Sequence, residues 1–262
     1  MTSWVPSPRR AFRVWQRNAS VYRRTWKTNI LPNFFEPLLY LLAIGVGLGA
    51  FVGRQIEGLR YASYLAPALA AVSATMGASF EVTWNAYVRI HMDKIWEAAT
   101  STPVMLQDVV LGELAWSASR GTIYGTAFLV VAALLGYVDT PLAILAVPAF
   151  ALLAFVFALL GMTFTALVPT IDFYSFYFTL FVTPLTLFSG VYFPLERMPG
   201  WLQGVAWFSP LRHSSCLLRV LFLGHRVGAT CAAAPLEALW LAGAAVLLFP
   251  LPALLLRRRL IR

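Results

Sequence analysis

Three ionisable side chains lie within or beside long apolar stretches of the sequence. Glu81 lies at the end of one stretch, and Glu113 and Arg120 share a helical face of the next, seven residues and about 10 Å apart. A charge at the centre of a bilayer costs at least about 2.5–3.5 kcal/mol, so each group must face protein or water and have a partner. Two interpretations stay open: a polar lining of a substrate path, or an ion pair between two helices.

The sequence contains no recognisable motif for catalysis or metal binding. His91, His213 and His225 have neither the spacing of metal ligands nor a set of carboxylates around them, and paired carboxylates and nucleophile elbows are missing. We therefore predict polar interfacial roles for the histidines, with no catalytic residue, metal or cofactor in this chain. A phosphate-binding loop is missing too, because neither of the two lysines follows a glycine. ATP-driven work would need another polypeptide.

The elements that position these residues are long apolar segments. Of 262 residues, 60% are hydrophobic and 12% are charged, about half the charged share of a soluble domain. Several apolar blocks approach or exceed the roughly 20 residues that cross a bilayer as a helix, and an open chain can satisfy its backbone in lipid only as helix. The sequence predicts one all-α integral membrane domain over 1–262. Its six expected spans are about Leu31–Val52, Tyr61–Trp84, Val109–Tyr137, Leu142–Val168, Phe173–Tyr192 and Leu236–Leu256.

Basic residues lie mostly on one side of these spans. Seven are in the first 30 residues, two in the loop after the second span and four in the tail, against six on the other side. This bias predicts that both termini are cytoplasmic, and it gives no argument for nucleic acid. Cys216 and Cys231 both fall on the outer side, where we expect free thiols, with a disulfide as the alternative.

Two segments outside the spans have amphipathic patterns. Within 9–30, aromatic residues recur every three or four positions from Phe12 to Trp26, opposite most of the basic residues. This pattern predicts a helix in the membrane surface, and a plain basic anchor is the alternative. Within 193–232, prolines separate short helices with apolar faces. We expect these helices to re-enter the outer leaflet before the last span.

The segment 89–106, RIHMDKIWEAATSTPVML, is longer than a tether between two spans requires. Asp93 and Glu97 lie away from its apolar helical face, and Thr102 and Pro103 have the form of an N-cap and first residue of the next helix. Such a helix fits a groove on a partner protein or lies on the membrane surface. The apolar face carries Met92, Ile95, Trp96 and Ala99.

With these features, the sequence resembles the six-span permeases of ABC exporters that move polysaccharides, glycolipids and drugs. The matching pieces are KIWEAATSTPVMLQDVVLGE, the outer FPLERMPGWLQ with FSPLRHS, and the tail LLRRRLIR. The pieces TWNAYVRI, WEAATSTPV and VVLGELAWSASR resemble, within that family, the nodulation branch of rhizobia. Each piece alone is a weak signal, but together they are specific, and the resemblance extends over about residues 12–262.

The resemblance implies a transport subunit of a bacterial inner membrane that is not itself an enzyme. Two copies of the chain would work with two copies of a separate ATPase of the nodulation protein I type, which uses the ATP. The cargo would be a lipid-linked oligosaccharide, the lipochitooligosaccharide nodulation factor. The segment 89–106 would be the cytoplasmic coupling helix, with Asp93–Met105 in the ATPase contact and Trp96, Glu97, Thr102 and Pro103 at its centre.

A cargo with an acyl tail needs an apolar lateral route, since each buried CH₂ contributes about 0.8 kcal/mol, and a polar or aromatic surface for its sugars. The fifth span has aromatic residues at nearly every turn. Ordinary core and lipid-facing packing explains such residues equally well. Our candidate path consists of Tyr174, Tyr177, Phe181 and Phe188 together with Glu81, Glu113 and Arg120.

Three other functions remain for comparison. A permease for capsule or O-antigen polysaccharide, or for drugs, has the same sequence chemistry. A membrane-embedded acyl- or glycosyltransferase predicts clustered His, Asp or Glu near one membrane face, which the sequence lacks. A membrane scaffold predicts that deleting the chain leaves export unchanged.

Overall fold

The computed structural model describes residues 6–47, 58–225 and 231–260, and its regular elements in these ranges are helices. The all-α prediction is therefore confirmed for the described residues. The main helices are α1 (Pro8–Tyr40), α2 (Tyr61–Phe80), α3 (Ile95–Thr100), α4 (Leu106–Leu134), α5 (Ala146–Leu167), α6 (Tyr174–Phe176), α7 (Thr183–Phe188), α8 (Gly200–Trp207), α9 (Pro210–Leu223), α10 (Ala234–Leu248) and α11 (Pro250–Leu260).

Short segments of other helix types extend several of these helices. π-helical turns follow α1 and α2 and join α6 to α7, and 3₁₀ turns precede α5, α6 and α8. The π-helical segments are η1 (Leu41–Gly47), η3 (Glu81–Asn85), η4 (Val88–Met92) and η7 (Tyr177–Val182). The 3₁₀ segments are η5 (Pro141–Leu145), η6 (Ile171–Phe173) and η8 (Leu195–Arg197).

Within the described ranges, four helices are long and apolar enough to cross a membrane: Tyr61–Met92, Pro141–Leu167, Ile171–Phe188 and Ala234–Leu256. α4 has 29 residues and carries acidic and basic groups in its first half. The first predicted span, Leu31–Val52, lies partly outside the described residues. The six-span arrangement thus remains a prediction, of which four spans have the required length and composition.

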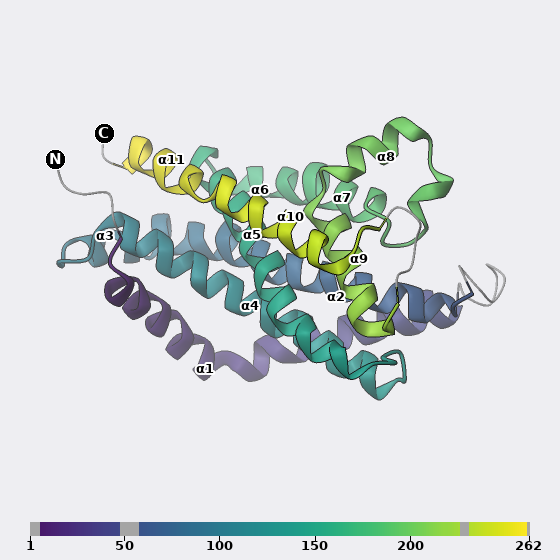
Figure 1. The fold of residues 1–262 in the computed structure, drawn as a ribbon. Coiled ribbons are helices and arrows are strands. Elements are labelled where there is room, and N and C mark those ends of the chain that lie inside the picture. Colours follow the sequence, from purple (N-terminus) through teal and green to yellow (C-terminus); the bar gives the residue numbers. More distant parts are fainter. Residues whose placement is uncertain (1–5, 48–57, 226–230, 261–262) are drawn as a thin grey trace.

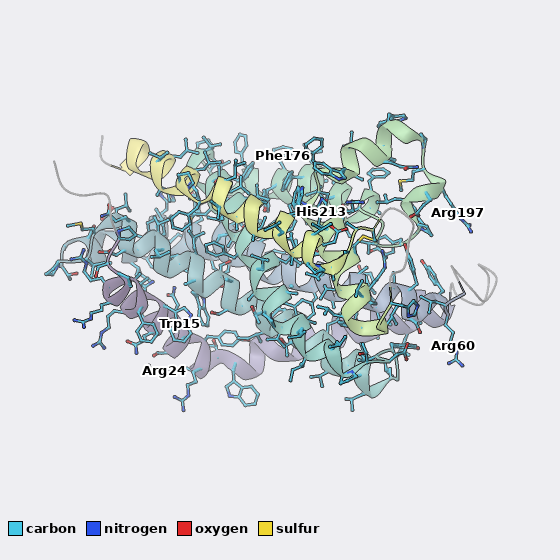
Figure 2. All side chains as sticks on the ribbon, viewed as in Figure 1. Trp15, Arg24, Arg60, Phe176, Arg197 and His213 are labelled. Atoms are coloured by element: carbon cyan, nitrogen blue, oxygen red, sulfur yellow. A yellow bond between two sulfur atoms is a disulfide. The ribbon has the colours of Figure 1, made fainter. Side chains whose placement is uncertain are left out.

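The long helices lie side by side, and the two ends of the bundle differ (Figure 1). The start of α1, the end of α11 and the short helix α3 lie at one end, which we call the α3 end. α8 lies at the opposite end, which we call the α8 end. Figure 2 shows Arg60 and Arg197 at the α8 end, and Trp15 and Arg24 along α1.

At the centre of the bundle, α2, α4 and α5 pack against one another through small residues. A Cβ atom at Gly121 of α4 would lie 2.6 Å from the carbonyl oxygen of Ala74 and 2.5 Å from the Cβ of Ala154. No side chain larger than hydrogen fits there, so glycine lets three helix backbones approach closely. Ala66, Ala70, Ala74 and Ala78 continue this small-residue surface along α2 and are completely buried.

The segment 193–232 forms two short helices, α8 and α9, where the prolines predict them. In α8, Trp201 and Phe208, the residue after its last turn, are each 72% exposed, whereas nearly all of α9 is buried. Cys216 and Cys231 form a disulfide with a Cα–Cα distance of 5.5 Å. Our expectation of free thiols was wrong, because α9 packs against α10 and brings together two cysteines that are 15 positions apart.

Candidate functional site

α3 follows a sharp turn of the backbone. Lys94, just before the helix, has a left-handed backbone (φ 49°), which turns the chain from η4 into α3. Trp96 is 2% exposed and belongs to a buried cluster with Ile90 and Val109, whereas Met92 is 60% exposed. We had expected Trp96 at the centre of a contact with another protein, but its burial in this chain leaves it no surface for such a contact. Of the predicted apolar face, Trp96 is buried by this chain's own core, Ile95 and Ala99 are half-buried, and Met92 is exposed.

The exposed side of the segment 89–106 is mostly polar and lies at the α3 end. Ile95 and Ala99 are half-buried at its edge. We call the exposed set the α3 outer face, and its residues are His91, Met92, Asp93, Lys94, Glu97, Ala98, Thr100, Ser101, Thr102, Pro103 and Met105.

The predicted helix start at Thr102 and Pro103 is wrong. The Thr102 hydroxyl donates to the Ala99 carbonyl (2.6 Å), so it closes the turn after α3. α4 begins at Leu106, because the Asp108 carboxylate accepts a hydrogen bond from the Met105 backbone N–H (2.9 Å) and caps the helix from its third position.

The capping carboxylate of Asp108 also holds the start of α1. It is completely buried and accepts hydrogen bonds from the Ser7 backbone N–H and from Arg10 Nε, both at 2.6 Å. Farther along, a Cβ at Gly112 would lie 2.6 Å from the Ala11 carbonyl oxygen, so α1 crosses α4 at close range. The head of the chain is therefore fixed to the bundle at its first turn.

This packing changes the expected orientation of the aromatic stripe in 9–30. Trp15 and Tyr22 contact Trp116 of α4, and Trp15 Nε1 donates to the Ser119 hydroxyl (3.0 Å). Phe12, like Trp26, stays exposed. The aromatic period predicted one membrane-facing stripe, whereas half of it covers another helix.

Five side chains form a connected set of ion pairs, which we call the charge cluster: Arg17, Glu81, Arg89, Glu113 and Arg120. Arg120 Nη1 lies 2.5 Å from Glu81 Oε2, and Arg89 Nη1 lies 2.7 Å from Glu81 Oε1. Glu113 accepts from Arg89 Nη2 (2.8 Å) and from Arg17 Nη2 (2.9 Å). The cluster joins α1, α4, the start of η3 directly after α2, and η4, which leads to α3.

The two glutamates of the charge cluster are buried, so their negative charges need partners that compensate them. Glu113 receives a further hydrogen bond from the Asn18 amide (3.0 Å), and the Arg120 guanidinium also donates to the Tyr124 hydroxyl. This geometry corresponds to the ion-pair interpretation of Glu81, Glu113 and Arg120, and a role of these residues in a path stays a prediction. Sequence reasoning missed Arg89 and Arg17, which it had counted as loop and head charges.

The aromatic residues chosen in the fifth span divide into two pairs. Tyr174 and Tyr177 are buried, and the Tyr177 hydroxyl lies 3.4 Å from the Ser79 hydroxyl of α2. Phe181 and Phe188 are exposed on the outside of this chain. These four residues therefore do not line one surface, and their role in a path stays a prediction.

A groove of about 460 Å³ lies between α2 and the Ile171–Phe188 helix. Much of the lining is apolar, with Leu69, Val72 and Met76 from α2 and Phe178 and Leu187 from the Ile171–Phe188 helix. Hydroxyl groups interrupt this apolar surface. The remaining lining residues are Tyr40, Ser73, Phe80, Tyr124, Phe128, Thr183, Thr186 and Tyr192.

Comparison with known proteins decides which family has this architecture. The ABC-2 type transporter family matches residues 10–223, which includes α3, the charge cluster and the groove. The chain belongs to the ABC-2 type transporter family. It is thus a membrane permease of the ABC transporter class, and the resemblance seen in the sequence is confirmed.

Relatives of this ABC-2 type transporter cover nearly its whole length. Nodulation protein J of Rhizobium leguminosarum bv. trifolii is 40% identical over 249 residues, which is 95% of this chain and 93% of the relative. Nodulation protein J of Rhizobium meliloti is 38% identical over 254 residues, 94% of this chain and 92% of the relative. The inner membrane transport permease YadH of Escherichia coli is 24% identical over 213 residues, 80% of this chain and 82% of that protein.

The part of this ABC-2 type transporter that the structure describes holds no group of three or more His, Cys, Asp or Glu side chains placed to bind a metal ion. His213 contacts a carboxylate, that of Glu237, and its Nε2 lies 2.7 Å from the Trp207 carbonyl oxygen. It therefore joins α9 to α10, a role that the sequence did not indicate.

Proposed function

We propose that this permease moves lipochitooligosaccharide outward across the bacterial inner membrane, as two copies of the chain with two copies of a separate ATPase of the nodulation protein I type. The observation that carries the proposal is the groove of about 460 Å³ between α2 and the Ile171–Phe188 helix. The cargo follows from the resemblance to the nodulation branch, and the relatives named nodulation protein J support it.

The lining of the groove suits a molecule with an acyl chain and sugars. Its volume falls within the roughly 300–1,000 Å³ of ligand sites, and Val72, Met76 and Leu187 give it apolar walls. An acyl chain gains about 0.8 kcal/mol for each CH₂ that it buries, whether in lipid or in such a groove. The hydroxyls of Ser73, Thr183 and other lining residues can bond to sugar hydroxyls at the same time.

The ATPase would act through the α3 outer face. The exposed residues Asp93, Glu97 and Thr102 supply the contact, and Trp96 anchors the segment in the core. Arg89, three residues before the end of η4 at Met92, pairs with Glu81 and Glu113, so a push on α3 reaches the end of α2 and α4 through buried ion pairs. No ATP binds to this chain in the proposed cycle.

The experiment compares two leucine-to-tryptophan variants in the Ile171–Phe188 helix. Leu187 lines the groove, whereas Leu180 is exposed and does not line it. In cells that make labelled lipochitooligosaccharide together with the ATPase, Leu187→Trp should lower export at least about tenfold, because an indole fills the groove. Leu180→Trp should leave export and ATPase binding unchanged.

Unchanged export in Leu187→Trp, with normal protein levels, would remove the groove from the path. A second arm offers a chitooligosaccharide without its acyl chain, and a loss of export is expected. Equal export of both forms would favour a polysaccharide permease instead.

A further inference from the structure

We propose that a row of aromatic side chains between the groove and the α3 end binds the sugar rings of the cargo. We call this row the aromatic lane, and its residues are Phe80, Trp84, Tyr87, Tyr174 and Phe178. The inference rests on the proposed function for the identity of the cargo. It adds where the sugars bind and in which direction the cargo enters.

One side of the aromatic lane follows the helix Tyr61–Met92. Phe80, Trp84 and Tyr87 are spaced four and three residues apart, as residues on one face of a helix are. His91 extends this row, since its ring lies 4.4 Å from that of Tyr87 between centroids. At about 1.5 Å per residue, the row from Phe80 to His91 is roughly 15 Å long. It is therefore longer than a single sugar ring.

The helix that contains α6 and α7 supplies the other side of the aromatic lane. Phe80 stacks on Phe178, with 4.3 Å between the ring centroids. Trp84 and Tyr87 both contact the Tyr174 ring, at centroid distances of 5.8 Å and 5.7 Å. Tyr174 is completely buried and thus holds the two rings in place from below. The ring contacts therefore reach from the groove to the α3 end.

The aromatic lane is continuous with the groove. Phe80 and Phe178, its first pair, also line the groove, and so does Met76, one turn earlier in α2. The groove and the lane thus lie between the same two helices. Along this surface the lining changes from aliphatic residues and hydroxyls, farther from α3, to aromatic rings beside it.

The exposure and polarity of the rings decide what the aromatic lane can bind. Phe80 is 45% exposed, and Trp84 and Tyr87 are half-buried, so parts of these rings stay open to a ligand. The face of an aromatic ring carries partial negative charge and attracts the polarised C–H groups of a sugar, while indole N–H and phenol O–H groups bond to sugar hydroxyls. None of the five lane residues is charged. The lane therefore suits a neutral oligosaccharide.

The backbone along the aromatic lane departs from α-helical geometry. Trp84 belongs to η3 and Phe178 to η7, both π-helical segments, and Tyr87 directly precedes η4, a third one. Such turns are rare and are frequent at functional sites. The lane thus coincides with the part of both helices where a binding site is most expected.

The position of the aromatic lane sets the direction in which the cargo enters. The lane ends beside α3 (Figure 1), and α3 meets the cytoplasmic ATPase in the proposed cycle. A lipid-linked sugar in the inner leaflet keeps its sugars at the membrane surface and its acyl chain toward the centre of the bilayer. Such a molecule can enter sideways between the two helices, with its sugars on Trp84 and Tyr87 and its chain in the groove.

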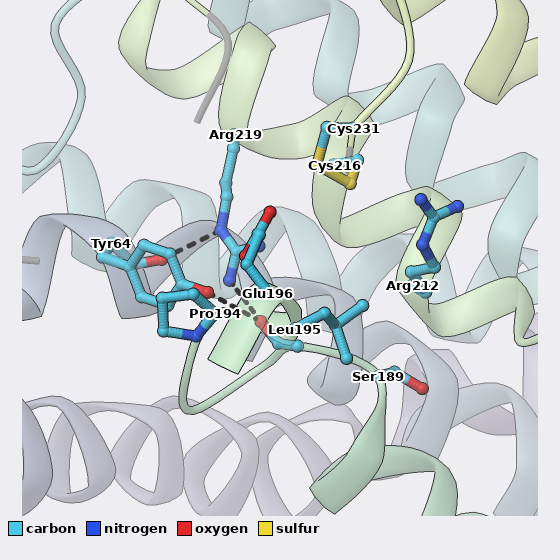
Figure 3. A pocket seen from close by; sticks show the side chains of 10 residues that line it. Tyr64, Ser189, Pro194, Leu195, Glu196, Arg212, Cys216, Arg219 and Cys231 are labelled. Carbon is cyan, nitrogen blue, oxygen red and sulfur yellow. Dashed lines mark hydrogen bonds between the residues drawn. A yellow bond between two sulfur atoms is a disulfide. The ribbon is translucent and has the colours of Figure 1, made fainter. Parts of the chain in front are cut away.

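A pocket near the α8 end has a different character. Its volume is about 10 Å³, room for one water molecule, and its lining includes two arginines, Arg212 and Arg219. Arg219 Nη2 donates to the Gly190 carbonyl oxygen (2.6 Å), and the guanidinium carbon lies 3.9 Å from the centre of the Tyr64 ring (Figure 3). This chain's own contacts therefore close that pocket, whereas the aromatic lane is open and uncharged.

The test measures sugar binding without transport. The permease and its ATPase are placed together in lipid nanodiscs, and chitotetraose, a neutral sugar without an acyl chain, is titrated while saturation transfer to its protons is followed by NMR. The wild type should bind chitotetraose. Trp84→Leu combined with Tyr87→Leu should raise the dissociation constant at least about tenfold, because leucine keeps apolar volume but has no aromatic face.

Two controls separate stacking on rings from apolar packing. Trp84→Phe combined with Tyr87→Phe keeps both aromatic faces and should bind nearly as tightly as the wild type. Trp201→Leu changes a tryptophan that is 72% exposed in α8 and should leave chitotetraose binding unchanged. Equal binding by the leucine pair and the phenylalanine pair would overturn the proposal. The absence of chitotetraose binding to the wild type would overturn it too.

Melting temperatures show which variants are folded. If the leucine pair does not fold, the single variants Trp84→Leu and Tyr87→Leu carry the test, and each should raise the dissociation constant about threefold. Two folded single variants that bind as the wild type does would reject the aromatic lane.

Export assays distinguish failure of the aromatic lane from failure of the proposed function. Both the leucine pair and Leu187→Trp should export less labelled lipochitooligosaccharide than the wild type. If Leu187→Trp blocks export and the leucine pair does not, the lane is rejected and the proposed function stands. If chitotetraose binds through the lane while Leu187→Trp exports normally, the sugar site stands and the acyl chain has no place in the groove.

Discussion

Arg89 and Glu113 form an ion pair, with 2.8 Å between Nη2 and Oε2, that joins the segment leading into α3 to α4. Glu113 is completely buried, whereas Arg89 keeps part of its side chain exposed. In the proposed cycle, this pair and the neighbouring pair with Glu81 link the segment that leads into α3 to the membrane helices.

Replacing Arg89 should therefore uncouple the permease without removing its partner. In Arg89→Gln, Glu113 keeps Arg17 and Glu81 keeps Arg120, so we expect a loss of stability of about 1.5–3 kcal/mol instead of unfolding. Export should fall at least about tenfold while the ATPase still co-purifies. The measurements are melting temperature, co-purification and export.

The matched control is Arg23→Gln, an exposed arginine of α1, which should change none of the three readouts. Adding Glu113→Gln to Arg89→Gln should recover part of the lost stability, because the buried carboxylate is then neutral. A double variant whose stability loss equals the sum of both single losses would show that the two side chains are not coupled.

Neighbouring residues of α3 should give opposite phenotypes. Trp96→Ala removes a buried indole and should cost about 3–5 kcal/mol of stability. Glu97→Arg reverses an exposed charge, so it should leave the melting temperature unchanged and reduce the ATPase recovered in a pull-down. Asp172→Arg, the same kind of charge reversal at an exposed residue of η6, is the control and should bind normally. Normal ATPase binding by Glu97→Arg would exclude α3 as the docking element.

The crossing of α1 and α4 should tolerate no side chain at Gly112. Gly112→Val places atoms against the Ala11 carbonyl and the Val14 side chain, and we expect a loss of about 1–3 kcal/mol or more. Gly243→Ala in α10 meets nothing within 4 Å and should be neutral or slightly stabilising. Thermal unfolding in detergent compares the two, and equal melting temperatures would contradict the close crossing.

The aromatic residues of the fifth span should separate into structural and functional classes. Tyr177→Ala empties a buried position and should lower the melting temperature strongly, whereas Phe181→Ala and Phe188→Ala should not. If the exposed pair belongs to the cargo path, only export changes in those two variants. Normal export by both would place them among lipid-facing residues.

Composition and periodicity predicted the helical class and the place of the segment between α2 and α4, because both depend on local sequence. The direction of Trp96 could not be predicted, since an amphipathic period marks a buried face without naming what covers it. The partners of Glu113 could not be predicted from the sequence either. The sequence paired it in pattern with Arg120 on the same helix, whereas its actual partners, Arg17 and Arg89, are brought by other segments.

Two further differences have separate causes, one local and one in the packing of helices. Thr102 and Pro103 have the form of a helix start, but the buried carboxylate of Asp108 provides the stronger cap three residues into α4. Cys216 and Cys231 carried no signal of pairing, because the contact that unites them is the packing of α9 against α10.

The two walls of the groove differ in how firmly the protein holds them. In the most apolar stretch of each helix, 78% of the residues are buried in Tyr61–Met92, whereas 22% are buried in Ile171–Phe188. Met76 is half-buried on a helix that packs mostly into the core, whereas Leu187 is exposed on a helix with few neighbours in this chain. We therefore expect cargo preference to drift during evolution through the Ile171–Phe188 wall, while the α2 wall stays the same. Exporters of different cargo could thus descend from one another by changes along a single helix face.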